Sequence, residues 1–242
     1  MKIFRFAALV LMVPCAVYAN RTDDVTAGGG AVIGNVGASI DIVGDSTLRN
    51  HTGSSHAIDF GFSYAKAKRK QDRDPGDQPV IFGGRTFRDV DGDIEWTSNI
   101  QLAHVGYRPR FWFGNSDWAI EGLIGAGWAG LGIKGEANGI STSERMSNAG
   151  GVFGLGGIWR FGTNTALQLR YLQFISGDKE GVTSASRGDI SVTHALGKNF
   201  QIRGGLGYLT AYSARENADD NILKSPIRAG GLGLLLGVDF VF

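Results

Sequence analysis

The chain has 242 residues and a formal net charge of +1, so its overall charge gives no reason to expect a nucleic acid partner. Its 38 glycines exceed the usual share of roughly 7%, and they stand inside apolar–polar alternations, not in a collagen period. The single cysteine excludes a disulfide framework and a thiolate metal site. No run after residue 19 reaches the ~20 apolar residues of a membrane-spanning helix, so entry into a membrane would require a closed barrel.

The first nineteen residues have the pattern of a secretory signal peptide. Lys2 and Arg5 supply positive charge, a short apolar run follows, and Val17-Tyr18-Ala19 is an acceptable cleavage site. We therefore predict a signal peptide at residues 1–19 and a single mature domain at residues 20–242.

Alternation with a period of two, which is typical of strands, recurs along the mature chain. Residues 94–113 change phase near Ala103 and His104, which predicts a β-bulge there. The strands expected from this alternation cover residues 34–43, 57–64, 80–87, 94–113, 118–128, 153–161, 167–171, 189–196, 200–208 and 228–242.

The last expected strand shows most clearly which environment each face of these strands contacts. Every second residue from Leu232 to Phe242 is large and apolar, while the residues between them are mostly small and include Asp239. An apolar outer face and a small, polar inner face are typical of the wall of a membrane β-barrel. The sequence therefore predicts an all-β fold, a closed antiparallel transmembrane barrel.

Turn signals divide the connections into two kinds. Short turns are expected near residues 115, 163 and 198, and longer loops at 135–148, 176–186 and 214–226. Short periplasmic turns and longer extracellular loops are the arrangement of outer-membrane barrels. If both ends of the chain lie in the periplasm the strand count is even. We expect about ten strands, or eight if residues 34–43 are an extension and 66–93 form one loop.

Charged and amide side chains occupy the inward positions of these strands. In a narrow barrel they would pair across the lumen, because an unpaired buried charge is costly. A barrel this small has room for side chains, whereas open porins need about sixteen strands, so we expect a sealed polar interior, with a narrow solute or ion pore as the alternative. The predicted interior network is Asp41, Asp59, Glu121, Arg160, Gln168, Arg170, Asp189, Gln201, Arg203 and Asp239.

Two stretches could carry chemistry. Asp89 to Asp93 places carboxylates at alternate positions, but its glycine does not fit a calcium-binding EF-hand loop, and we interpret it as an acidic loop. His56 follows two serines, and with Asp91 it is the candidate site of a second alternative, an outer-rim hydrolase. No Gly-x-Ser-x-Gly nucleophile motif is present. We predict no enzymatic activity, no catalytic residue, no cofactor and no metal.

The signal peptide, the alternation and the aromatic-x-aromatic end at Phe240 and Phe242 resemble small bacterial outer-membrane barrels of the OmpA, OmpX and opacity-protein group. The resemblance implies residence in the outer membrane of a Gram-negative cell, contact with membrane lipid and lipopolysaccharide, and a monomeric state. It also implies periplasmic chaperones and a barrel-assembly machinery that reads Phe240 and Phe242. The expected role is structural or surface-interactive, with a possible ligand bound by the extracellular loops.

Overall fold

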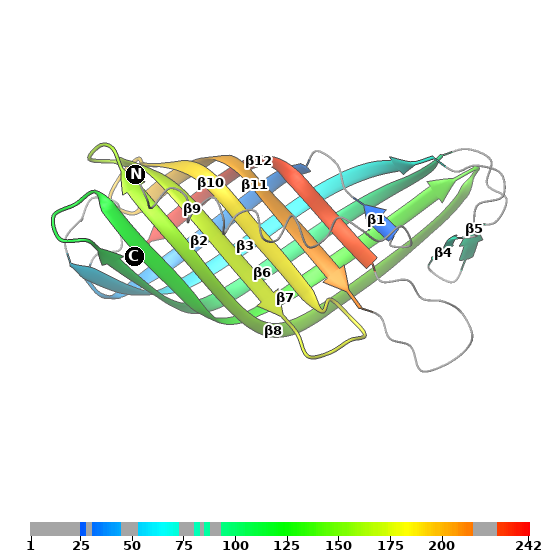
Figure 1. The fold of residues 1–242 in the computed structure, drawn as a ribbon, viewed down its shortest axis with the longest axis horizontal. Helices are drawn as coiled ribbons and strands as arrows, with labels where there is room; N and C mark the ends of the chain where they lie inside the picture. The colour runs from blue at the N-terminus through cyan, green and yellow to red at the C-terminus, as the bar shows by residue number, and fades with distance from the viewer. Residues whose placement is uncertain are drawn as a thin grey trace, which may run out of the picture.

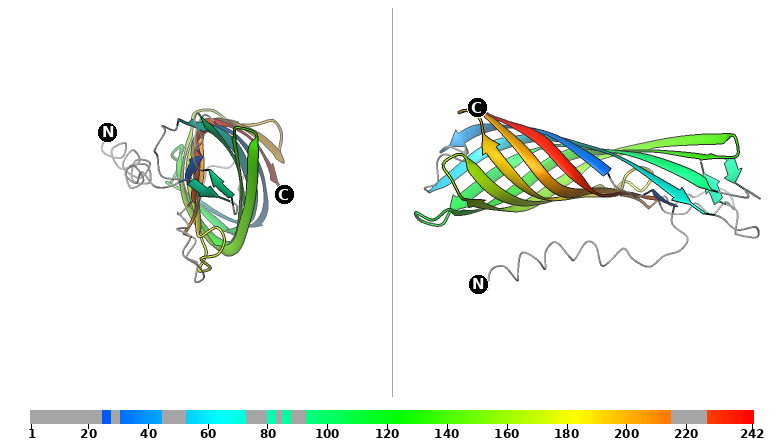
Figure 2. Two further views of the ribbon diagram at one scale, coloured as in Figure 1. Left: turned by 90° about the vertical axis from the view of Figure 1, so that its right-hand side faces the viewer. Right: turned by 90° about the horizontal axis from the view of Figure 1, so that it is seen from above.

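The computed structural model describes residues 25–27, 31–44, 53–72, 80–82, 85–87, 93–214 and 227–242. These residues form β-strands and turns, without a helix, and most of the strands wrap into an elongated barrel (Figures 1 and 2). The strands are β1 (Val25–Ala27), β2 (Ala31–Val43), β3 (Ser54–Gln71), β4 (Val80–Phe82), β5 (Arg85–Phe87), β6 (Ile94–Trp112), β7 (Trp118–Ala137), β8 (Ile140–Arg160), β9 (Thr165–Ile175), β10 (Ser184–Ala195), β11 (Phe200–Ser213) and β12 (Ile227–Val241).

The barrel is a ring of nine strands in the order β2-β3-β6-β7-β8-β9-β10-β11-β12. All neighbours along the chain pair antiparallel, and the ring closes through β12 and β2, which run parallel from Gly233 opposite Ala31 to Val241 opposite Ser39. β1 continues this parallel pairing along the start of β12. The all-β barrel is confirmed, but the expected count of ten strands is wrong, as is the alternative of eight. An odd ring can close only through parallel neighbours.

The strand expected at residues 80–87 does not join the ring. It forms a separate two-stranded hairpin of β4 and β5. The pair Gly83-Gly84 in its centre is a hairpin turn signal, which explains why the alternation of this segment is weak.

The bulge expected at Ala103 and His104 is absent. β6 keeps one register with β3 from Ile94 opposite Gln71 to Phe111 opposite Ser54. Its even-numbered residues therefore all point inward, and Trp96 is completely buried. The phase change in the sequence arises because the inner face is itself apolar at one end of the barrel, so apolar residues lie on both faces of the strand in turn.

Residues 135–148 form paired strand where a loop was expected. β7 and β8 make one long hairpin that pairs from Trp118 opposite Trp159 to Ala137 opposite Ile140. The turn is Asn138-Gly139, with φ angles of 46° and 76°. Positive φ at both central residues defines a type I′ turn, for which Asn-Gly is the preferred sequence.

The connections separate into two rims. The turn rim carries the short turns after β6, β8 and β10 together with the carboxyl end of β12, and these turns fall where the sequence predicts them. The loop rim carries the tip of the β7–β8 hairpin, the β9–β10 loop and the first residues of β6 and β12. β3, β6, β7 and β8 extend beyond the other strands on this side (Figure 1).

The outer wall exposes large apolar side chains on every strand of the ring. We call this surface the apolar belt. At its turn-rim edge Trp118 and Trp159 stack with their ring centroids 5.5 Å apart. Beyond its other edge, β3, β6, β7 and β8 present polar residues such as Lys66, Glu95 and Lys134.

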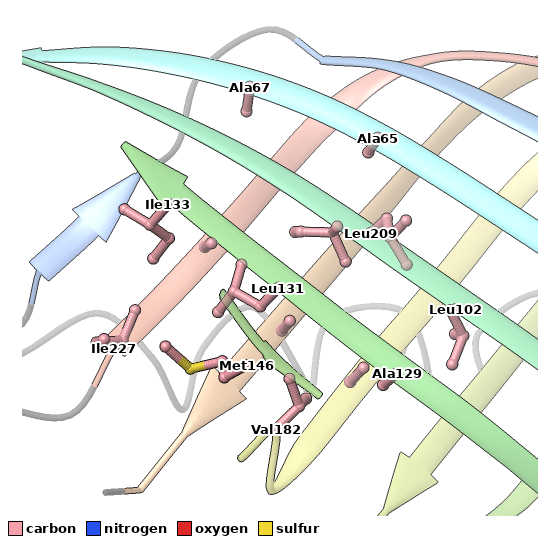
Figure 3. Packing of buried hydrophobic residues seen from close by; sticks show 14 of the residues in the cluster. Ala65, Ala67, Leu102, Ala129, Leu131, Ile133, Met146, Val182, Leu209 and Ile227 are labelled. Carbon is pink, nitrogen blue, oxygen red and sulfur yellow. The ribbon is translucent and has the colours of Figure 1, made fainter. Parts of the chain in front are cut away.

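The interior is filled by side chains in three layers. The turn-rim cluster is apolar and consists of Trp112, Ala119, Ile158 and Ala166. A charged layer follows, described below. The loop-rim cluster, part of which is shown in Figure 3, is apolar and comprises Ile33, Ala65, Ala67, Ile94, Trp96, Ile100, Leu102, Ala129, Leu131, Ile133, Ala137, Met146, Val152, Leu172, Phe174, Val182, Ala185, Leu209, Ala211, Ile227, Ala229 and Leu235.

Candidate functional site

The charged layer lies between the two apolar clusters and is the main concentration of buried charge in the described residues. Strand alternation directs its members into the lumen, because each occupies an inward-pointing position of its strand at a similar height in the barrel. It joins the side chains of Arg108, Arg110, Arg170, Arg187 and Arg203 with those of Asp59, Glu121, Asp189 and Asp239.

Glu121 on β7 is held by two arginines from different strands. Arg110 Nη2 lies 3.0 Å from Glu121 Oε2, and Arg170 Nε lies 2.6 Å from Glu121 Oε1. The side chains of Glu121 and Arg110 are only 5% and 3% exposed. Gly156 on β8 faces Glu121 in register, and a Cβ there would lie 2.8 Å from Glu121 Cγ. The glycine therefore makes room for the carboxylate.

Asp59 on β3 forms a second charged group with two residues of β6. His104 Nε2 lies 3.0 Å from Asp59 Oδ2, and Arg108 Nη1 lies 3.1 Å from Asp59 Oδ1. A Cβ at Gly61 would overlap the imidazole ring of His104. Gly61 therefore leaves space for the inward-pointing imidazole ring of His104.

Arg187 on β10 bridges the lumen. Its Nη2 lies 2.9 Å from Asp189 Oδ2, and its Nη1 donates to Ser63 Oγ on β3 at 2.9 Å. Asn35 on β2 donates to the same hydroxyl at 3.1 Å. The guanidinium thus links strands on different sides of the ring. Arg203 on β11 pairs with Asp239 on β12 in the same layer.

Little empty volume remains among these groups. One cavity of about 60 Å³ is bordered by both signs of charge, including His104, Glu121 and Arg187, and a second of about 10 Å³ lies beside Gln201 and Asp239. A cavity needs roughly 10–15 Å³ to hold a single water, so the larger cavity has space for ordered water and the smaller one is at this limit. The two cavities are the size of isolated hydration sites.

The structure places the predicted interior residues in two groups. Asp59, Glu121, Arg170, Asp189, Arg203 and Asp239 meet in the charged layer, and Gln168 and Gln201 are buried beside it. Asp41 and Arg160 lie at the turn rim instead. Arg160 Nη2 is 3.2 Å from the largely exposed carboxylate of Asp117, and its guanidinium carbon is 5.9 Å from the centre of the Trp112 ring.

Sequence reasoning missed four members of the layer: His104, Arg108, Arg110 and Arg187. Arg108 and Arg110 have the inward phase even with the expected bulge, opposite Val105, Tyr107 and Phe111, but they were not assigned to the network. His104 was placed in the bulge itself. Arg187 lies just beyond the loop expected at 176–186, in a strand that begins at Ser184, five residues earlier than the alternation predicts.

Of the two residues considered for a hydrolase site, the structure describes His56 but not Asp91. His56 lies near the turn-rim end of β3 and points outward, where its ring stacks on Tyr107, with centroids 5.7 Å apart, and shares a hydrogen bond with it. Asp89 to Gly92, with the second candidate residue Asp91, lie outside the described residues.

The two terminal aromatics lie on the outer wall at the turn rim. Phe240 packs against Phe200, with ring centroids 5.3 Å apart, and against Phe242 at 6.5 Å. The main chain of Phe242 hydrogen-bonds to Ser39 and Asp41 on β2. The chain end therefore belongs to the closing seam of the barrel.

In comparisons with known proteins the chain matches no family model, no curated protein and no solved structure. No helix in the described part of the chain is long and apolar enough to cross a membrane. Within the same residues, no group of three or more His, Cys, Asp or Glu side chains is placed to hold a metal ion.

Proposed function

We propose that the protein is a monomeric outer-membrane β-barrel whose interior is sealed and whose loop rim faces the outside of the cell. Its role is structural, or surface-interactive through the loops on that rim. The observation that carries this proposal is the apolar belt. Leu155, Leu232 and Ile124 are each about two thirds exposed, far more apolar surface than a soluble monomer presents as one patch.

The height of the belt fits a bilayer. Its outward apolar residues run from Val32 to Ile42 on β2, from Trp118 to Trp128 on β7 and from Leu232 to Phe242 on β12. Each run covers ten steps of about 3.3 Å, or ~33 Å along the strand. At a strand tilt of about 40° this gives ~25 Å along the barrel axis, the height of the apolar band in membrane barrels.

The packing of the interior favours a sealed barrel and not an open pore. The charged layer pairs each of its arginines with a carboxylate, the two cavities among its side chains are small, and an apolar cluster lies on either side of it. The β9–β10 loop adds to the closure at the loop rim, because Val182 is completely buried among the loop-rim cluster. Asn148 anchors this loop by donating to the carbonyl oxygens of Asp178 and Val182.

Biogenesis follows the same proposal. The turn rim faces the periplasm, and Phe240 and Phe242 form the signal read by the barrel-assembly machinery after delivery by periplasmic chaperones. Their exposed, mutually packed rings support this role. The lipid and lipopolysaccharide of the outer membrane contact the apolar belt and the polar collar above it.

A charge placed in the centre of the belt tests the membrane location. Replacing Ile124 by arginine is expected to lower the free energy of unfolding in lipid vesicles by about 2–4 kcal/mol. In water the same exposed position would tolerate arginine within about 0.5 kcal/mol. Denaturant titration, followed by the different gel migration of boiled and unboiled barrel from the outer-membrane fraction, measures this difference.

Ser143→Arg is the matched control, because Ser143 points outward from β8 beyond the belt, opposite Lys134. It is expected to change the free energy of unfolding by less than about 0.5 kcal/mol. Equal, small effects of the two substitutions, or identical migration before and after boiling, would contradict the proposed location.

Conductance separates the sealed barrel from a pore. In planar bilayers the purified protein is expected to show no channel events above background. If it does conduct, the charged layer lines the path, and Arg170→Gln would change the ion selectivity. Steady channels whose selectivity changes with that substitution would contradict the sealed barrel and support the pore.

A further inference from the structure

The outer wall is hollowed by a groove of about 770 Å³ over the parallel seam of the barrel. It extends across β3, β2, β12, β11 and β10 and is walled by apolar residues such as Phe62, Tyr64, Val192 and Leu236. This volume is within the range of small-molecule pockets. The groove lies inside the apolar belt, so its walls continue the surface that we assign to lipid.

Two outward glycines form part of the groove, Gly34 on β2 and Gly204 on β11. A Cβ at Gly204 would meet no atom within 4 Å, and one at Gly34 would only reach a backbone oxygen at 4.0 Å. Glycine inside a strand costs roughly 0.5–1 kcal/mol relative to a residue with a side chain. Packing within the barrel does not require these glycines, but an open groove does.

A column of lysines stands directly beyond the groove on β3. Tyr64 pairs with Gly34 at the groove, and the next outward residues toward the loop rim are Lys66, Lys68 and Lys70. Among the described residues only Lys68 of the three forms an ion pair, with Glu95 at 2.9 Å. Positive charge is thus available where the apolar belt gives way to its polar collar.

We propose that this groove binds a membrane lipid with a phosphate headgroup, its acyl chain lying over Gly34 and Gly204 and its phosphate at Lys66. Lys70 adds positive potential to the same site. The lipid belongs to the leaflet on the loop-rim side. The inference rests on the proposed membrane location, and it adds to it a defined site on one side of the wall.

The test is lipid retention by the refolded full-length mature chain. The barrel is inserted into phosphatidylcholine vesicles that contain a minority of phosphatidylglycerol and is then extracted in mild detergent. Mass spectrometry counts the lipids that remain bound. The wild type is expected to retain lipid enriched in phosphatidylglycerol, and the double variant Gly34→Leu/Gly204→Leu is expected to lose this retained lipid.

The lysines are tested separately. Lys66→Gln/Lys70→Gln is expected to keep the acyl chain site but to lower the enrichment in phosphatidylglycerol by roughly 25-fold, since each of the two lysines near a membrane surface contributes about fivefold. Unchanged enrichment in this variant would show that the two lysines do not bind the lipid phosphate, and that part of the proposal would be wrong.

Gly157→Leu is the matched control for the groove. Gly157 is an outward strand glycine on β8 with no atom within 4 Å of an added Cβ, and it lies outside the groove. It is expected to retain lipid like the wild type. If the barrel inserts and the groove-filling variant retains as much lipid as this control, the site is refuted while the membrane location stands. If the wild type does not insert, the membrane location itself fails.

Discussion

Replacing Glu121 by leucine is expected to lower the free energy of unfolding by about 3–5 kcal/mol. Its two oxygens are the partners of Arg110 and Arg170 inside the barrel. Leucine would leave both guanidinium groups without that carboxylate in a space that the apolar clusters shield from water. A buried charge stripped of its partner is one of the few single changes that reaches this magnitude.

The same physics predicts that the loss can be reversed without restoring the carboxylate. In the triple variant Glu121→Leu/Arg110→Met/Arg170→Met the unpaired charges are gone, and stability is expected to return to within about 1–2 kcal/mol of the wild type or above it. Urea titration in detergent micelles, followed by gel migration and tryptophan fluorescence, measures both variants. A triple variant no more stable than Glu121→Leu would show that the loss comes from packing instead of charge.

Asp117→Asn is the surface counterpart of this experiment. Asp117 also pairs with an arginine, Arg160, but its side chain is 56% exposed. An exposed ion pair contributes about 0–1 kcal/mol, so this substitution is expected to be nearly silent. A similar loss at Asp117 and Glu121 would mean that the charged layer is as well solvated as the rim, and the sealed interior would then be wrong.

The outer face of the barrel could be predicted from the sequence because it follows one rule. From Leu232 to Phe242 the large residues alternate with small ones without interruption, and the structure exposes five of the six. The short turns were predictable for the same local reason, since a Gly-Thr-Asn or Gly-Lys-Asn stretch ends the alternation. Period and turn chemistry are properties of neighbouring residues and need no knowledge of the tertiary fold.

The interior was harder to predict because its polarity changes along the barrel. Trp96 and Ile100 face the loop-rim cluster, while Arg108 and Arg110 on the same face of β6 belong to the charged layer. A rule that puts apolar residues outside assigns the first pair to the wrong face and then needs a bulge to recover the phase. Only the register with β3, set by residues distant in sequence, settles which face is inside.

The predicted even number of strands was wrong for a related reason. An even number follows only if both ends of the chain lie on one rim, and no local pattern reports where the first strand starts relative to the last. The parallel pairing of β2 with β12 is the longest-range contact in the ring, so it depends on the whole barrel. Asn138-Gly139, by contrast, is a local hairpin signal in the sequence. It was not used because the polar residues at 135–148 were interpreted as a loop.

Parallel closure leads to a second large effect, the separation of the two ends. Val25 to Ala27 lie beside Ile227 to Ala229 at the loop rim, whereas Phe242 lies at the turn rim beside Ser39. An epitope tag inserted immediately before Val25 is therefore expected on the same side of the membrane as the β7–β8 hairpin tip. In the proposed orientation, intact cells bind the antibody as fully as permeabilised cells do.

Two single cysteines calibrate the sides in the same cells. Ser141→Cys lies beside the hairpin tip and Lys198→Cys in a turn at the other rim, and both side chains are exposed. A membrane-impermeant maleimide is expected to label the first in intact cells and the second only after permeabilisation. A tag before Val25 that becomes accessible together with Lys198→Cys would place the first strand antiparallel to the last. Such a barrel would have an even number of strands, and the nine-stranded closure would be wrong.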